Sequence, residues 1–394
     1  MTRRAPKYLL LFLLSTNIFV FWPLSKISYE IPKVWFVNRI IEVIGVASLI
    51  FIFSLKKAIY DKRLIFLSLA FLLVVIISSI TGADFNKSLF GNLYRGDGIL
   101  TLLHFYILMF FLLLYFEKSW LASIFKTIGY TNFFLDIWII FNFCISLYAN
   151  PIFANWGGAM GVNFGNPNFL SGYLLVTLPF AHHLYEKGKS NILKTAFVLQ
   201  IIAIFLTQAW SGILGSILYT LFIILNKHKN YKVGLITILI FLTTAGLYVS
   251  SYKGLYDNGK LVAESRGRII AKGLLAFKQK PILGWGWANF DYAFESIDWP
   301  IKLNNDVYVD KAHSTLLEIL VATGVVGFVI YLALLYKVGA NLYSVKSKYS
   351  SYLFAVFILY VLHSQTNITS ISEELIFWTL AGIATAYHLG GEIP

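Results

Sequence analysis

Long apolar stretches alternate along the chain with short polar ones. A helix needs about 20 mostly apolar residues to cross the hydrocarbon core of a bilayer. Windows of that size predict twelve spans, near residues 8–25, 35–55, 63–81, 98–116, 120–148, 169–186, 193–208, 210–226, 231–250, 313–336, 349–364 and 374–390. The pattern therefore predicts an all-α integral membrane protein with one polytopic domain over residues 1–394. A signal peptide is the alternative interpretation of the first stretch, and we expect a retained signal anchor there because no small-residue cleavage pattern follows it.

Composition supports the membrane class. Of the 394 residues, 58% are hydrophobic and only 13% are charged, whereas soluble domains carry about 25% charged residues. The single cysteine, Cys144, excludes an internal disulfide and a paired-cysteine zinc site.

The distribution of Lys and Arg predicts the orientation. If the N-terminus is cytoplasmic, eighteen of the 32 basic residues lie on that side and five lie in the short loops opposite. The other nine fall in the long segment 251–312, and long loops largely escape the charge rule. We therefore expect both termini in the cytoplasm and segment 251–312 outside it, and we read the net charge of +13 as topology and not as affinity for nucleic acid.

The extracytoplasmic loop 251–312, between the ninth and tenth spans, contains a segment of helical character at 269–280 that Pro281 ends. Leu274 lies on its apolar face, and Arg268 and Lys272 lie on the opposite one. Such a helix either rests at the bilayer interface with its cations near phosphates or packs as a cap on the helical bundle.

The residues of this loop that favour chemistry are one histidine and several cations. His313 stands at the start of the tenth span and can act as a base near neutral pH. Arg266, Arg268 and Lys311 can stabilise negative charge on a diphosphate leaving group. The carboxylates form no compact metal-binding pattern, so the inventory predicts glycosyl transfer from a lipid diphosphate without a metal ion or other cofactor.

Several short motifs follow one another in order between about residue 90 and residue 335. They are Arg266, Pro-Ile-Leu-Gly-Trp-Gly at 281–286, Ala-His-Ser at 312–314, Leu-Glu at 317–318, Gly-Val-Val-Gly at 324–327, and two stretches at 95–100 and 165–170. Together they resemble the O-antigen ligase and O-antigen polymerase superfamily of bacterial inner-membrane proteins. Three positions depart from that pattern: Ile270 replaces a frequent Trp, Ser314 replaces an Asn, and 210–212 lacks an Arg.

The resemblance implies inverting transfer of a glycan from undecaprenyl diphosphate to a hydroxyl on a glycan or lipid-anchored acceptor, at the extracytoplasmic face of the inner membrane. It implies that His313 accepts or orients the acceptor proton and that Arg266 holds the diphosphate. Arg268, Lys311 and Arg95 are expected as secondary phosphate contacts. The spacing to Pro281 favours Arg266 over Arg268 as the family arginine, and both stay candidates.

Other polar residues have two interpretations each. Arg95 either contacts phosphate or pairs with Asp97 in its loop. Asn166 and Asn168 either bind sugar or form a turn that caps the next helix. Within the predicted spans, an ion pair with Arg39 accounts for Glu42, whereas Asp136 has no evident partner in the sequence.

The alternative function is a membrane transporter or flippase of lipid-linked glycans, which would place its polar residues at the membrane midplane. A non-catalytic scaffold of the cell envelope is a third possibility. Within the transferase interpretation the sequence does not separate a ligase, a polymerase and a transferase to protein hydroxyls, and it leaves the sugars and the oligomeric state open.

Overall fold

The structure is a computed structural model that describes residues 5–22, 29–50, 60–149, 154–156, 158–187, 191–227, 255–257, 260–298, 308–344 and 347–387. The helices of its first half are α1 (Ala5–Thr16), the 3₁₀ turn η1 (Asn17–Phe19), α2 (Glu30–Ile50), α3 (Lys62–Ile80), α4 (Phe85–Phe90), α5 (Ile99–Tyr115), α6 (Trp120–Ser146) and α7 (Pro167–Lys187). Those of the second half are α8 (Asn191–Leu206), α9 (Trp210–Lys227), α11 (Arg266–Gln279), α12 (Phe290–Glu295), α13 (Thr315–Ser344), α14 (Ser350–His363) and α15 (Ile371–Tyr387).

The helical class is confirmed. Eleven of the twelve predicted spans coincide with a described helix, and the span predicted at 231–250 lies outside the described residues. Three described helices, α3, α6 and α13, are long and apolar enough to cross a membrane, and five shorter apolar helices accompany them. Several stretches of the predicted loop 251–312 also lie outside the described residues.

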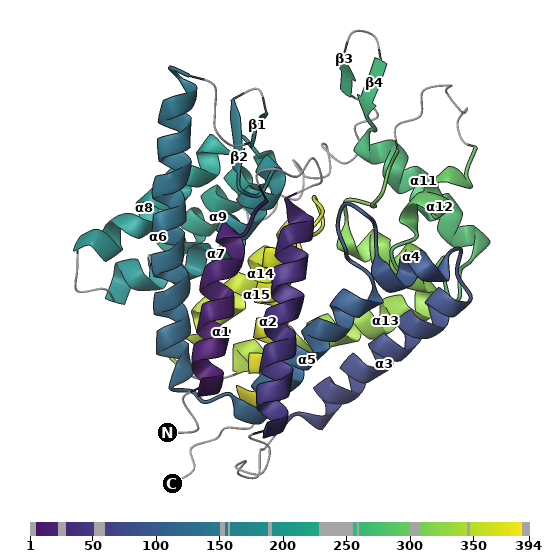
Figure 1. Cartoon of the computed structure of the whole chain (residues 1–394), viewed down its shortest axis with the longest axis horizontal. Coiled ribbons are helices and arrows are strands. Elements are labelled where there is room, and N and C mark those ends of the chain that lie inside the picture. Colours follow the sequence, from purple (N-terminus) through teal and green to yellow (C-terminus); the bar gives the residue numbers. More distant parts are fainter. Residues whose placement is uncertain are drawn as a thin grey trace.

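Two short hairpins add strands that the apolar pattern did not predict. β1 (Ala154–Trp156) pairs antiparallel with β2 (Ala159–Val162), and β3 (Leu255–Asp257) pairs antiparallel with β4 (Lys260–Ala263). In Figure 1 both hairpins, α11 and α12 lie away from the end of the molecule at which α1 begins. The described elements of the predicted outer loop therefore lie opposite the start of α1.

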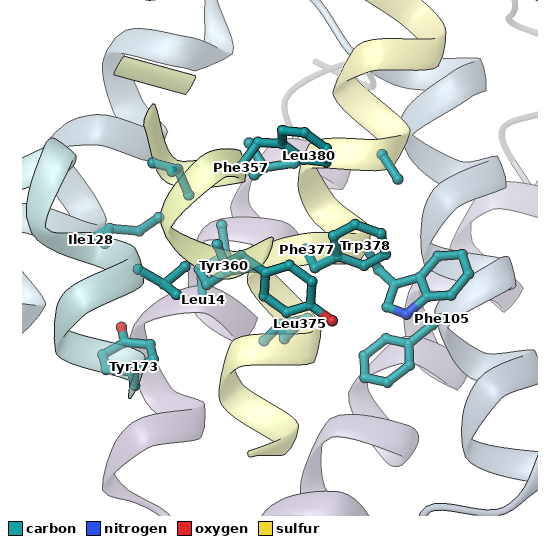
Figure 2. Close-up of a cluster of buried hydrophobic side chains, with 14 of the residues drawn as sticks. Leu14, Phe105, Ile128, Tyr173, Phe357, Tyr360, Leu375, Phe377, Trp378 and Leu380 are labelled. Carbon is teal, nitrogen blue, oxygen red and sulfur yellow. The ribbon is translucent and has the colours of Figure 1, made fainter. Parts of the chain in front are cut away.

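The main core surrounds α15. α3 packs against α13, α5 against α15, and α7 against α8 and α14. Figure 2 shows the aromatic centre of this core, where Trp378 stacks on Phe105 with ring centroids 6.1 Å apart and Tyr360 stacks on Phe377 at 4.5 Å. Because these rings come from α5, α14 and α15, they fix the three helices relative to one another.

A break in α13 joins the outer loop to the bundle. Gly324 has a φ of 64° and a ψ of −169°, so the helix is interrupted there although the apolar pattern runs through it. The turn 281–286 enters this break: Trp285 N and Gly286 N donate to Val321 O and Ala322 O (2.9 Å each) and Val325 N donates to Pro281 O (2.8 Å). The turn thus supplies hydrogen-bond partners to both halves of the helix, which would otherwise leave buried backbone groups unpaired.

Helix α11 is a cap on the bundle, and its cationic face is turned inward. The helix begins at Arg266, three residues before the predicted beginning at 269, and Ser265 caps this start by accepting from Arg268 N at 3.3 Å. Arg268 and Lys272 are buried, with 8% and 1% exposure, whereas Leu274 is 43% exposed. Of the two interpretations of this helix, the burial of Arg268 and Lys272 therefore agrees with the cap on the bundle and not with cations at lipid phosphates. The Lys272 Nζ lies 4.0 Å over the Phe294 ring of α12 and gains a cation–π contact there.

Candidate active site

The loop between α4 and α5 presents two charged side chains, Arg95 and Asp97. Asp97 is held in the loop because its Oδ1 accepts from Asn92 N at 3.1 Å. Trp287 Nε1 donates to the Asp97 backbone oxygen at 2.9 Å and so fastens this loop to the segment after α11. Two stretches far apart in the sequence are thereby fixed side by side.

Arg95 and Asp97 do not pair with each other as one interpretation of the sequence had it; each pairs with a residue of the segment that leads into α13. Arg95 Nε lies 2.5 Å from Asp310 Oδ2, and Lys311 Nζ lies 2.6 Å from Asp97 Oδ2. Lys311 Nζ also lies 3.3 Å from Glu318 Oε1. These crossed ion pairs bring Arg95 and Lys311, which are more than 200 positions apart, into one cluster.

The charges of the cluster stabilise one another. Burial alone would lower the pKa of Lys311, but the Asp97 and Glu318 carboxylates raise it above its ordinary value. Burial would raise the pKa of Asp97, yet the Lys311 ammonium holds it below the usual range. The ammonium and the Asp97 carboxylate therefore both stay charged near neutral pH.

His313 follows this cluster directly, in an unusual backbone conformation. Its φ is 54°, in the left-handed region that few non-glycine residues occupy. Its neighbours hold it there, since Ala312 N donates to Glu318 Oε2 at 2.8 Å and Thr315 N donates to Ser364 O at 2.8 Å. The strain is thus overcome by bonds on both sides of the residue.

The surroundings of His313 keep its imidazole neutral. Burial lowers the pKa of the ring well below its ordinary value, and the Arg266 and Arg95 guanidinium groups lower it further. A neutral imidazole can accept a proton, as a general base requires. Arg266, the first residue of α11, therefore lies within electrostatic range of His313.

Arg268 has a different environment from Arg266. Its NH1 lies 3.3 Å from Glu264 Oε2, one helical turn earlier, and the side chain is buried. Of the two arginines that the sequence left as candidates, the one that acts on His313 is Arg266.

A cavity of about 150 Å³ lies beside His313. Arg95, Lys311 and His313 line it, whereas Arg266 and Arg268 are outside the lining found among the described residues. The other polar and aromatic residues of the lining are Glu30, Asp97, Thr101, Phe105, Trp287, Ser314, Thr315, Glu318, Tyr331, Tyr360, Asn367, Thr369, Glu374, Phe377 and Trp378.

Asn166 and Asn168 form a turn at the start of α7. Asn166 Oδ1 accepts from Asn168 N at 2.8 Å, and Asn166 O accepts from Leu170 N at 3.2 Å. Neither asparagine is among the cavity-lining residues in the described part of the chain. This geometry agrees with the cap interpretation of both residues.

Sequence reasoning missed the carboxylates Glu30 and Glu374, which reach the cavity from α2 and α15. Both stand in the first turn of a helix. Glu30 lies just before the predicted span 35–55, and Glu374 is the first residue of the predicted span 374–390. A carboxylate at a predicted membrane boundary was the available signal. It is weak because such residues usually face water.

The two intramembrane carboxylates singled out earlier have different surroundings. Arg39 NH2 lies 2.5 Å from Glu42 Oε1, which confirms the predicted pair, and His104 Nε2 lies 2.9 Å from the same oxygen. Asp136 is fully buried in α6, and its carboxylate oxygens have no hydrogen-bond partner among the described residues. Neither residue lines the cavity in the part of the chain that the structure describes.

Part of the chain is similar to a known family. The family model described as O-antigen ligase matches residues 195–332. The matched segment includes Arg266, Arg268, Lys311 and His313, whereas Arg95 and the asparagines of α7 precede it. No curated protein matches the chain. The match over residues 195–332 supports the resemblance of this membrane protein to the O-antigen ligase superfamily.

Proposed function

We propose that the protein is an inverting, metal-independent glycosyltransferase of the bacterial inner membrane. Its donor is a glycan on undecaprenyl diphosphate, and its acceptor is a hydroxyl group of a second glycan or of a lipid-anchored acceptor. The termini are cytoplasmic and the cavity opens on the extracytoplasmic side. The observation that carries the proposal is the imidazole of His313 and two cations on the wall of one cavity, with the Arg266 guanidinium in electrostatic range.

In the proposed reaction one residue acts as the base and three cations stabilise the leaving group. The acceptor oxygen attacks the anomeric carbon from the face opposite the diphosphate, and the carbon–oxygen bond to the diphosphate breaks. His313 takes the proton of the acceptor hydroxyl as the new bond forms. Arg266, assisted by Lys311 and Arg95, stabilises the charge that develops on the departing diphosphate.

The cations near the cavity are held by neighbouring groups before a substrate arrives. Lys311 is bound between Asp97 and Glu318, and Arg95 is bound to Asp310. Positions fixed in this way need little reorganisation when a charged group binds, which is how electrostatic stabilisation of a transition state becomes effective.

Substitution of His313 tests the proposal. A His313→Ala variant, produced from a plasmid in a strain that lacks the gene, should form less than about 1% of the wild-type glycan product because the base contributes 10²–10⁴-fold. The measurement is the attached surface polymer, with the amount of protein in the membrane fraction measured alongside.

His104→Ala is the matched control. His104 of α5 pairs with Glu42 of α2, and it is not among the cavity-lining residues in the described part of the chain. The variant should retain activity. Full activity of His313→Ala would contradict the role of His313 as the base.

In the deletion strain, loss of all attached glycan indicates a ligase, and loss of chain length alone indicates a polymerase.

The transporter alternative has one observation in its favour, the buried Asp136 of α6. An Asp136→Asn variant that blocks movement of lipid-linked glycan across vesicle membranes, in a protein that forms no glycosidic bond, would support that alternative.

A further inference from the structure

The cavity beside His313 carries a second set of residues that the proposed reaction does not use. They are the carboxylates Glu30 and Glu374, the hydroxyl groups of Tyr360 and Thr369, and the indole of Trp378. They come from α2, from α14 and α15, and from the segment between those two helices. None of them belongs to the cation–imidazole group described above.

Glu30 has one oxygen fixed and one without a partner. Its Oε2 accepts from Ile371 N, the first amide of α15, at 2.9 Å. The residue is 5% exposed, and its Oε1 has no hydrogen-bond partner among the described residues. A buried carboxylate oxygen is costly to leave unpaired, so a hydroxyl group brought by a ligand would be bound well there.

The carboxylate of Glu374 is also held by its neighbours. Its Oε1 accepts from Tyr360 OH and from Thr369 Oγ1, both at 2.7 Å. The side chain is only partly buried, in contrast to the fully buried Glu373 beside it. The two hydroxyl groups fix the orientation of a carboxylate that lines the cavity.

Trp378 follows Glu374 by one helical turn of α15. Its ring stacks on Phe105 at an interplanar angle of 5°, which holds the indole in one orientation (Figure 2). An aromatic side chain next to hydrogen-bond acceptors in the cavity wall matches a sugar, since a pyranose ring has an apolar face of C–H groups and an edge of hydroxyl donors.

The size of the cavity limits what it holds. A cavity of about 150 Å³ has room for about one six-membered ring, since an engineered protein cavity of that volume binds benzene. We propose that Glu30, Glu374 and Trp378 form a subsite for one uncharged sugar ring of a glycan substrate, next to the bond that His313 helps to form. The inference rests on the proposed glycosyl transfer. The acceptor oxygens of Glu30 and Glu374 match the hydroxyl donors of an uncharged sugar, whereas the carboxylate of an acidic sugar would bring further acceptors to the same place.

The test uses the full-length protein in lipid nanodiscs and measures transfer at varied substrate concentrations. The probes are the lipid-linked glycan that accumulates in the deletion strain and the acceptor fraction extracted from the same strain. Glu30→Gln and Glu374→Gln should each raise the KM for one probe about tenfold and change kcat less than about threefold. The probe whose KM rises identifies whether the donor or the acceptor sugar occupies the subsite.

Glu42→Gln is the matched control, because Glu42 lies on the same helix as Glu30 and pairs with Arg39 and His104 instead. It should leave both KM values within twofold of the wild type. If both cavity variants also leave both KM values within twofold, the subsite is refuted, and a bound water would then satisfy Glu30. If Glu30→Gln fails to fold, Glu374→Gln decides, since its glutamine oxygen can still accept from both hydroxyl groups.

The outcomes separate this inference from the proposed function. A wild-type protein that forms no product, or a fully active His313→Ala variant, contradicts the glycosyl transfer itself. An active wild type that loses activity with His313→Ala but is insensitive to both glutamine variants contradicts only the subsite. Linkage analysis of the wild-type product should find an uncharged sugar at the new bond, and a bond between two acidic sugars would also overturn the subsite.

Discussion

At the scale of single residues, the proposed chemistry depends on how much positive charge surrounds the His313 imidazole. His313 is partly buried and lies in the field of Arg266 and Arg95, and both effects favour its uncharged form. A histidine in a solvent-exposed loop would instead be partly protonated at neutral pH. The same cations that would hold a diphosphate therefore also keep the base ready to accept a proton.

This coupling predicts a pH dependence. The active, neutral form of His313 is lost as the pH falls through its lowered pKa, so activity should persist below about pH 6.5, the ordinary histidine value. Arg266→Gln removes one cation, so the pKa rises and the acid limb of kcat/KM moves toward neutral pH, in addition to a lower maximum. Arg39→Gln, remote from the cavity in its pair with Glu42, should leave the limb in place. An unmoved limb in Arg266→Gln would refute the electrostatic coupling.

The sequence predicted part of this residue environment. His313, Arg95, Lys311 and Arg266 were all expected near the site, because each stands in a motif or in an outer loop close to a span. The crossed pairs of Arg95 with Asp310 and of Lys311 with Asp97 were not predictable, since sequence proximity suggested the pair of Arg95 with Asp97. Spacing along the sequence indicates ion pairs within one helix or loop. These pairs instead join the loop before α5 to the segment before α13, so the spacing could not indicate them.

At the scale of elements, apolar periodicity located the helices well but did not decide what their faces contact. Most span boundaries lie within five residues of the end of a described helix, because the hydrocarbon core sets their length. The exceptions are α1, which ends nine residues before its predicted span does, and α13, which ends eight residues after it. For α11 the pattern separated a cationic face from an apolar one correctly, yet the cationic face is the buried one. The ring of Phe294, which stabilises the buried Lys272, comes from the next helix and could not be inferred from α11 alone.

The break of α13 gives a prediction at this scale. A Cβ at Gly324 would overlap the carbonyl oxygen of Ile282, and the backbone conformation there (φ 64°, ψ −169°) adds a cost of about 1–3 kcal/mol for any other residue. Gly324→Ala should therefore lower the unfolding temperature by several degrees in a thermal scan of the detergent-solubilised protein. It should also reduce activity, because it displaces the turn that holds the outer loop.

Gly158→Ala separates the two contributions. Gly158 also has a positive φ, 97°, but a Cβ there would come no closer than 3.5 Å to Gln208 Nε2. It should show the smaller, conformational effect only. Equal losses in the two variants would mean that the contact with Ile282 adds nothing.

At the scale of the whole molecule, α1 begins at one end and the helices of the outer loop lie toward the other (Figure 1). This arrangement agrees with the orientation that the basic residues predict. The sequence could not predict that α2, α14 and α15 contribute to the cavity, because Glu30 and Glu374 are separated by most of the chain.

Sidedness is tested by cysteine labelling in a Cys144→Ser background, because the native thiol is exposed. A cysteine in place of the exposed Ser296 after α12 should react in intact cells with a thiol reagent that does not cross membranes. A cysteine in place of the exposed Lys187, at the end of α7, should react only after the cells are opened. The reverse pattern would contradict an extracytoplasmic active face and with it the proposed function.

The interruption at Gly324 also divides α13 into two halves whose rotation about the helix axis is set separately. The first half, Thr315–Thr323, follows His313 and is hydrogen-bonded to the turn 281–286. The second half starts after Gly324, where Val325 N donates to the carbonyl oxygen of Pro281. One residue inserted after Gly324 would rotate the rest of the second half by about 100°, but it would leave the orientation of the first half unchanged. The second half can therefore vary in length without changing the orientation of the His313 imidazole.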